Sequence, residues 1–286
     1  MSKIAVITDS NSGILPQEAA ERGIRVVPMP FTIDDETYYE GINLTREEFY
    51  QHMEEGAAIA TSQPSPEEVM KIWDEALETN DEIVYIPMSS GLSGSCQSAL
   101  MLSDDYDGRV QVVNNQRISV TQKRSVLDAL DMAEHSMTAA EIKAELERVK
   151  MESSIYIMLD TLKYLKKGGR ITPAAAAIGA LLRIKPVLQI KGERLDAFSK
   201  ARTLAQGKNI MIGAMKHDIE TLYGGLHKEN VWLYAVHGYV PTQFAEFSQE
   251  VRNAFPAFNV EDDMLSLSVA CHIGPGALAI ACSKKI

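Results

Sequence analysis

The chain has 286 residues, which is enough for one large or two modest domains, since a domain usually takes about 100–200 residues. Hydrophobic residues make up 45% of it and charged residues 23%, a composition that excludes disorder as the main state. The 39 acidic side chains outnumber the 28 basic ones, for a formal charge of −11. Nucleic-acid binding by phosphate neutralisation, or docking on anionic lipid, would require the opposite sign, so both classes are disfavoured.

The lengths of the apolar runs and the number and spacing of the cysteines indicate the cellular compartment. The longest apolar run, residues 174–182, is half the length of a membrane span, and the apolar stretch after Lys3 is too short for a signal peptide. The three cysteines cannot all pair, and none has the C-x-x-C spacing. We therefore expect buried, reduced thiols in a cytoplasmic protein.

Short apolar runs alternate with amphipathic stretches in the first half of the chain. Strands are predicted at residues 4–7, 24–31, 83–86 and 110–113, and helices at 16–22, 67–77, from about 96, and 126–133. Pro28 and Pro30 confine the second strand to a sheet edge. Strands that alternate with helices indicate a parallel sheet covered on both faces.

After about residue 150 the pattern changes. Strands are predicted at residues 155–159, 187–190, 231–236, 265–269 and 278–281, and helices near 174–182, 205–222 and 242–255. These strands are farther apart and partly alternating, which indicates a mixed or antiparallel sheet. The fold class is therefore α/β with two domains: a Rossmann-like parallel sheet in residues 1–150, and an α/β domain with a mixed or antiparallel sheet in residues 151–286.

A serine- and glycine-rich loop follows the strand at 83–86. Ser93 lies where a helix N-cap is expected, and its hydroxyl with the free N–H groups of the helix favours an anion. The same residues fit a turn that only caps its own helix. The loop is not a hydrolase nucleophile elbow, because serine is the last residue of Gly91-Leu92-Ser93-Gly94-Ser95, and no P-loop lysine follows.

The segment from Thr61 to Glu68 predicts a helix start. Ser65 and Glu68 form a capping box, with Pro66 at the first helical position. This leaves Thr61 and Ser62 without a local role. Their hydroxyls either face a ligand or bond to their own backbone.

His272 precedes Gly274-Pro275-Gly276, which suggests a fixed turn that aims its ring. In the extended conformation expected there, the neighbouring residues Cys271 and His272 point to opposite faces, so we expect that they do not share a site. The histidines show neither an H-x-x-x-H nor an H-E-x-x-H pattern, so we expect no metal site. No cofactor is expected either.

The small residues of the predicted helix at 174–182 permit close packing. They fill a core or line a narrow apolar tunnel, and core packing is the commoner use of such a helix.

Six segments, in this order along nearly the whole chain, resemble the DegV family of fatty-acid-binding proteins. They are Thr61-Ser62-Gln63-Pro64-Ser65-Pro66, Ser89-Ser90-Gly91-Leu92-Ser93-Gly94, Leu159-Asp160-Thr161-Leu162 with Lys166-Lys167-Gly168-Gly169-Arg170-Ile171, Ile184-Lys185-Pro186, Lys200-Ala201-Arg202-Thr203, and His272-Ile273-Gly274-Pro275-Gly276.

The resemblance implies two α/β domains with a long-chain fatty acid, such as palmitate, stearate or oleate, between them. It implies that Thr61, Ser93 and His272, with Ser62 as a further member, bind the carboxylate, and that the acyl chain lies in an apolar tunnel of the second domain. It also implies a carrier that is not itself an enzyme. A separate fatty acid kinase subunit, related to dihydroxyacetone kinase, would form acyl phosphate for phospholipid metabolism.

By the same resemblance, Arg170 and Arg202 are expected to face that kinase subunit. Residues 114–123 depart from the family pattern at a strand end, where head-group or partner contacts could differ.

Two other functions compete with the carrier. The first is a serine esterase or thioesterase that uses Ser93 and His272, although the elbow motif is absent. The second is a sugar-phosphate binder, whose anion-friendly loops lack a neighbouring lysine.

Overall fold

The computed structural model describes residues 2–170, 172–178 and 184–286. The chain divides into two compact units, the first formed by Met1–Lys150 with Ser266–Ser268 and the second by Met151–Leu265 with Val269–Ile286. The predicted α/β class is confirmed, with a parallel sheet in the first unit and a mixed sheet in the second.

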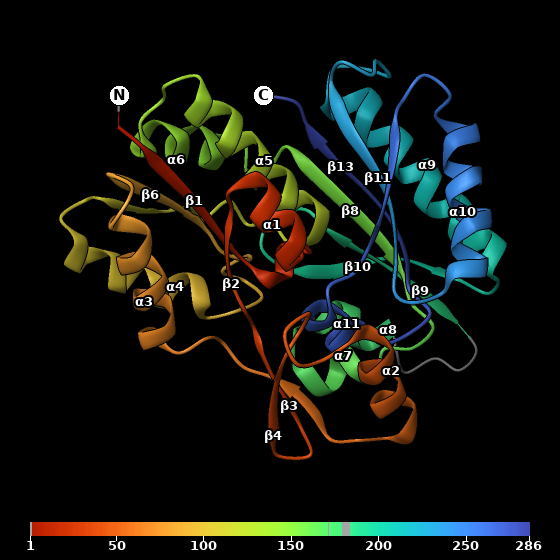
Figure 1. The fold of residues 1–286 in the computed structure, drawn as a ribbon. Coiled ribbons are helices and arrows are strands. Elements are labelled where there is room, and N and C mark those ends of the chain that lie inside the picture. Colours follow the sequence, from red (N-terminus) through yellow and green to blue (C-terminus); the bar gives the residue numbers. More distant parts are fainter. Residues whose placement is uncertain (1, 171, 179–183) are drawn as a thin grey trace. The chain divides into compact units, whose positions relative to one another are not determined.

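The first unit contains a four-stranded parallel sheet in the order β2-β1-β6-β7 (Figure 1). Its strands are β1 (Ile4–Asp9), β2 (Arg25–Val27), β6 (Glu82–Ile86) and β7 (Val110–Val112). Ala5 and Ile7 pack on one face, against α3 (Pro66–Leu77) and α4 (Ser95–Ser103). Val6 packs on the other face, against α1 (Pro16–Arg22), α5 (Ser119–Glu134) and α6 (Ala139–Arg148). Both faces are buried, which is why the strands read as continuous apolar runs.

A three-stranded antiparallel sheet in the order β4-β3-β5 completes the first unit, together with α2 (Arg46–Glu55). Its strands are β3 (Pro30–Ile33), β4 (Glu36–Tyr39) and β5 (Ile59–Thr61). The predicted strand at 24–31 is therefore two strands. Pro28 has no N–H for a ladder, so β2 ends at Val27 on the edge of the parallel sheet, and β3 begins in the second sheet.

The second unit is built on a six-stranded sheet in the order β10-β9-β8-β13-β11-β12, antiparallel except between β11 and β12. The strands are β8 (Ser153–Met158), β9 (Lys185–Ile190), β10 (Leu195–Ala201), β11 (Val231–His237), β12 (Val260–Met264) and β13 (Leu278–Lys284). Two long helices, α9 (Leu204–Leu222) and α10 (Pro241–Ala254), pack on one face of this sheet through Met211, Met215, Phe247 and Val251.

Three short helices remain among the described residues, and the last of them corrects one prediction. They are α7 (Lys163–Gly168), α8 (Pro173–Ile178) and α11 (Leu267–Ile273). The predicted strand at 265–269 is wrong, because a short apolar run cannot be assigned to strand or helix by periodicity alone. The predicted helix at 174–182 corresponds to α8 as far as Ile178, and residues 179–182 lie outside the described residues.

The second unit also differs from the predicted range of 151–286, because Ser266–Ser268 belong to the first unit. Long-range hydrogen bonds to Asn11 and Glu40 hold these three residues there. Helix α11 therefore begins in one unit and continues in the other.

Two glycines of α9 offer a matched test of packing in the second unit. A Cβ at Gly207 would overlap the Met158 sulfur, whereas a Cβ at Gly213 would meet nothing within 4 Å. We expect Gly213→Ala to stabilise the fold by about 0.5–1 kcal/mol through helix propensity. Gly207→Ala should destabilise it by about 1–3 kcal/mol, because Met158 must move. Urea unfolding of both variants checks this, and shifts of the same sign would contradict it.

Candidate functional site

The order of the parallel sheet locates its ligand-binding edge. The chain runs from β1 outward to β2, and later from β6 to β7 on the other side, so the order reverses between β1 and β6. Ligands of open α/β sheets bind beyond the carboxyl ends of the strands at such a point. The segments that follow these two strands, Ser10–Ser12 and residues 87–94, contain five serines.

A fully buried carboxylate lies beneath these segments. Asp9 Oδ2 accepts the Met88 backbone N–H at 2.8 Å, and Asp9 Oδ1 accepts two bonds from Asn11 and one from Gln122 Nε2. Burial raises the pKa of Asp9 above its ordinary value, against the opposing effect of these hydrogen bonds. The four bonds tie the ends of β1 and β6 to α5, and the loops above them are fixed by the protein's own groups.

The serine loop is held at a second point, and its predicted cap is corrected. Ser89 N–H donates to Arg117 O at 2.8 Å, and Ser93 N–H donates to Ser89 O at 3.2 Å. Gly94 is the N-cap of α4, so Ser93 lies one residue before the cap, where its Oγ accepts the Ser95 N–H at 3.2 Å. A hydroxyl that accepts this bond still has its own hydrogen to donate to a ligand oxygen.

Thr61 and Ser62 belong to the neighbouring antiparallel sheet. Thr61 is the last residue of β5 and is half-buried, and the exposed Ser62 donates its N–H to Pro30 O at 3.2 Å. Gln63 Nε2 then contacts Ser98 Oγ of α4 at 3.4 Å, and a Cβ at Gly94 would lie 3.2 Å from Gln63 Oε1. These contacts hold the segment after Thr61 against the start of α4, beside Ser93. The capping box predicted for Ser65 and Glu68 is confirmed.

His272 lies on helix α11, so the prediction that it and Cys271 alternate on a strand is wrong. Its imidazole packs closely on α7, because a Cβ at Gly168 would lie 2.5 Å from His272 Nδ1. Burial and, as a smaller cause, the positive charge of Arg170 together lower the pKa of His272 from 6.5 to about 4. The ring is therefore neutral at pH 7 and donates from one nitrogen only.

The glycines of the turn after His272 have a steric role. Gly274 and Gly276 have φ of 80° and 84°, in the left-handed region that favours glycine. A Cβ at Gly274 would overlap the ring of Tyr164, and one at Gly276 would overlap the carboxylate of Asp160. The turn is thus packed against the segment that leads into and through α7.

The two predicted partner-contact arginines lie on different elements of the second unit. Arg170 follows α7, is half-buried, and donates from Nη1 to Gly168 O, close to His272. Arg202 follows β10 and is exposed, and its N–H donates to Gln206 Oε1 at 2.8 Å.

The segment at 114–123, which departs from the family pattern, supports the serine loop from within. Arg117 is buried and donates to Ser125 Oγ and Val149 O, and Asn115 donates to the same serine. Gln122 belongs to the Asp9 network. The sequence predicts that this segment lies near the ligand, but the roles of Asp9, Asn115 and Gln122 depend on hydrogen-bond partners elsewhere in the chain, which local patterns do not reveal.

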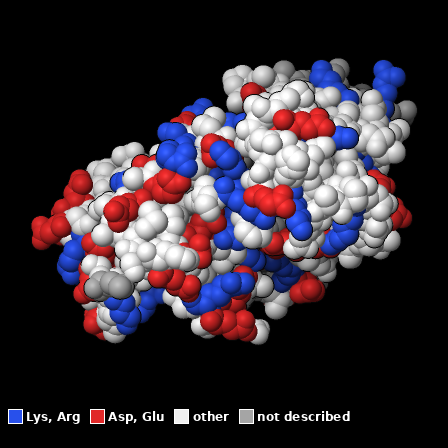
Figure 2. All heavy atoms as spheres, turned by 90° about the horizontal axis from the view of Figure 1, so that it is seen from above, with Lys and Arg blue, Asp and Glu red and all other residues white. Residues whose placement is uncertain are grey.

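Charge is unevenly divided along the sequence. Residues 1–150 contain 27 acidic and 12 basic side chains, whereas residues 160–202 contain three acidic and ten basic ones. On the face drawn in Figure 2, acidic and basic side chains are intermingled. In the part of the chain that the structure describes, no helix is long and apolar enough to cross a membrane.

Comparison with known proteins identifies the family. A family model described as "Uncharacterised protein, DegV family" matches residues 3–285. The chain belongs to the DegV family. A DegV domain-containing protein of Listeria innocua is 32% identical over 288 residues, which cover 99% of each chain.

Two solved DegV structures share the whole fold. One is described as the fatty acid binding of a DegV family protein from Thermus thermophilus; it is 32% identical with a TM-score of 0.89, over 99% of this chain and 100% of the other. The other is DegV from Bacillus subtilis, described as a fatty acid binding protein; it is 26% identical with a TM-score of 0.86, over the full length of both chains.

The depressed pKa of His272 predicts how stability of this DegV chain depends on pH. Between pH 6.5 and about 4 the unfolded chain protonates this histidine and the folded chain does not, so this contribution to stability is lost as the pH falls through that window. In His272→Gln, the loss of stability from about pH 7 to about pH 4.5 should be smaller, by on the order of 2 kcal/mol. Urea unfolding at both pH values measures it, with the exposed His135→Gln as the control. Equal losses in wild type and His272→Gln would contradict it.

The contact between Gly168 and the imidazole predicts a second effect. Gly168→Ala should displace the His272 ring, because the new methyl group would lie within van der Waals distance of three ring atoms. The measurement is the imidazole ¹⁵N chemical shifts of His272. Lys166→Ala, an exposed change on the same helix, is the control. Shifts no larger than those of the control would rule out the contact.

Proposed function

We propose that this chain binds a long-chain fatty acid and presents its carboxylate to a separate kinase that forms acyl phosphate. The observation that carries the proposal is the likeness to the Thermus thermophilus protein over 99% of this chain, because that protein is described by its fatty acid binding. The described geometry supports it, since the segments of Thr61 and Ser93 adjoin and both residues offer hydroxyl donors.

The head group is bound, in this proposal, by Thr61, Ser62, Ser93 and His272. Hydroxyls and a neutral imidazole offer hydrogen-bond donors without a full charge, and each bond to a carboxylate contributes about 1.5–3 kcal/mol. The guanidinium of Arg170 adds a positive field at His272. With these donors and this positive charge at the site, a protein of net negative charge can bind the carboxylate of a fatty acid.

Affinity comes mainly from the acyl chain. A sixteen-carbon acid has about 14 methylenes, and at ~0.8 kcal/mol each their burial is worth on the order of 11 kcal/mol. This term exceeds that of any single head-group contact. The head-group residues therefore orient the acid for delivery more than they retain it.

The kinase partner, in this proposal, docks on the basic part of the second unit. Ten basic side chains between residues 160 and 202 suit an acidic partner surface, and exposed Arg202 and half-buried Arg170 are its proposed contacts. Charge complementarity of this kind speeds association and selects the partner.

Mass spectrometry of an organic extract from the denatured, purified protein tests the ligand. We expect a stoichiometric fatty acid with 14–18 carbons, as the DegV resemblance implies. An empty extract, with no uptake of palmitate on incubation, would overturn the proposed function.

Ser93→Ala tests the head-group assignment. It should weaken palmitate binding about tenfold, the loss of one hydrogen bond to a charged group, and should leave the unfolding midpoint nearly unchanged. Ser103→Ala, at the other end of α4 with a local bond to Leu100 O, is the matched control. Unchanged affinity and unchanged acyl phosphate formation would remove Ser93 from the site. Steady hydrolysis of an acyl ester by this protein alone, abolished in Ser93→Ala, would instead favour the esterase.

A further inference from the structure

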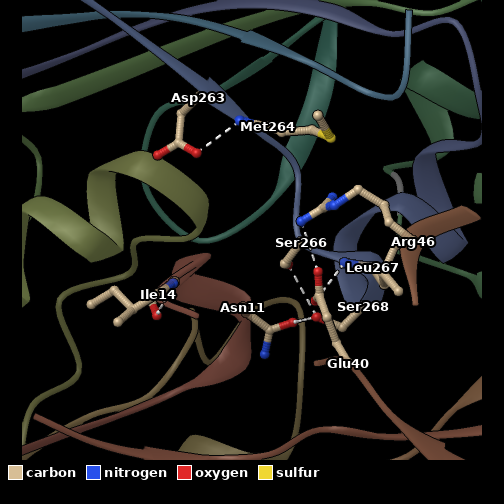
Figure 3. Close-up of polar contacts among 10 residues, drawn as sticks. Asn11, Ile14, Glu40, Arg46, Asp263, Met264, Ser266, Leu267 and Ser268 are labelled. Carbon is tan, nitrogen blue, oxygen red and sulfur yellow. Dashed lines mark hydrogen bonds and ion pairs between the residues drawn. The ribbon is translucent and has the colours of Figure 1, made fainter. Parts of the chain in front are cut away.

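The start of helix α11 is held by the first unit (Figure 3). The chain leaves the second unit after Leu265, places Ser266–Ser268 in the first unit, and returns at Val269. Ser266, Leu267 and Ser268 are all at least 96% buried. A three-residue excursion of this kind needs specific contacts to hold it.

The first contact is a buried carboxylate at the helix start. The Leu267 backbone N–H donates to Glu40 Oε2 at 2.8 Å, and Arg46 Nη2 lies 2.9 Å from Glu40 Oε1. The Glu40 side chain is only 7% exposed. The first N–H groups of a helix have no partner within it, so Glu40 satisfies one of them and complements the helix dipole.

The second contact is a buried amide. Ser268 Oγ donates to Asn11 Oδ1 at 2.6 Å, and Ser266 Oγ lies 3.2 Å from Ser268 Oγ. Asn11 Nδ2 donates to Asp9 Oδ1 at 2.9 Å, which fixes the orientation of the amide. The Asn11 amide oxygen that accepts the Ser268 hydroxyl is therefore held in one orientation by Asp9.

These two contacts join Ser266–Ser268, at the start of α11, to segments of the first unit near two of the proposed head-group residues, Thr61 and Ser93. Asp9, which holds Asn11, also accepts the N–H of Met88 at the start of the serine loop. Glu40 directly follows β4, in the sheet whose strand β5 ends at Thr61. A polar network of the first unit thus includes the beginning of α11 and the start of the serine loop, while Glu40 lies next to the sheet that contains Thr61.

His272 lies four residues after Ser268, one turn later on the same face of α11. We propose that Asn11 and Glu40 are positioning residues for His272: by fixing the first turn of α11 they set the direction in which its imidazole is presented. For fatty acid binding this inference rests on the proposed function. Neither residue needs to touch the ligand.

The first experiment reads the imidazole without any ligand. Ser268→Ala removes the hydroxyl that bonds to Asn11 and keeps a good helix former. It should change the imidazole ¹⁵N shifts of His272 in histidine-labelled protein, with His272→Ala assigning the signals. Ser154→Ala, which removes another buried hydroxyl contact, to Tyr223 at 2.8 Å, is the matched control and should not change them.

The second experiment measures coupling through palmitate affinity. Ser268→Ala should weaken binding about three- to tenfold in the wild type, the effect of one hydrogen bond, and less than about 1.5-fold in a His272→Ala background. A role through the histidine requires this non-additivity. Equal weakening in both backgrounds would overturn the inference.

Three further variants, at Asn11 and Glu40 themselves, keep the inference testable. Asn11→Ala should reproduce the shift changes of Ser268→Ala. Glu40→Gln retains an oxygen for the Leu267 N–H and should change the imidazole signals less than Glu40→Ala. If all four variants leave the His272 signals as in wild type, neither residue positions the ring.

Failure of the inference is separable from failure of the proposed function. If wild-type protein binds palmitate and His272→Ala weakens it, while Ser268→Ala changes neither affinity nor shifts, the inference fails and the function stands. If wild-type protein takes up no fatty acid, the function fails, and the imidazole shifts alone decide whether Asn11 and Glu40 position His272.

Discussion

The buried carboxylate of Asp9 imposes the constraint on which the rest of the first unit depends. Removing a carboxylate from water costs several kcal/mol unless donors replace the lost hydration. Its donors are Asn11 after β1, Met88 after β6 and Gln122 in α5, so these elements must keep their register for the carboxylate to remain satisfied. The edge of the sheet where ligands usually bind is therefore rigid. The serine loops at this edge are held in place by hydrogen bonds within the protein and do not need a ligand to order them.

This arrangement separates the two requirements of a carrier. In the proposed function the acyl chain supplies most of the binding free energy through burial, which is insensitive to direction. Hydrogen bonds to the head group are weaker but directional, so they decide how the carboxylate is presented. A rigid set of donors around Thr61 and Ser93, and a neutral His272 held beside Arg170, suits presentation to a second protein better than turnover within this one.

Much of the fold could be predicted from local patterns. The strands β1, β6 and β7, the helices α1 and α3, and the capping box of Ser65 depend on residues close in sequence. The errors occur where distant partners decide. The N-cap of α4 is Gly94, where Gln63 of the neighbouring segment lies too close for a larger side chain to fit easily. Residues 267–273 form a helix whose first N–H is satisfied by Glu40, more than 200 residues earlier. Edge strand β12, with three consecutive acidic residues, lacks the apolar pattern on which the other assignments depended.

The sequence by itself determined the alternation of strands and helices, the change of sheet type near residue 150, and the ordered segments by which the chain resembles its family. These are properties of short stretches, whose periodicity and turn chemistry do not depend on the rest of the chain. Only the tertiary structure decided that Asp9 is the centre of a polar network, that Ser266–Ser268 return to the first unit, and that His272 is neutral. Each of these follows from burial and from hydrogen bonds between residues far apart in sequence, which come together only when the chain has folded.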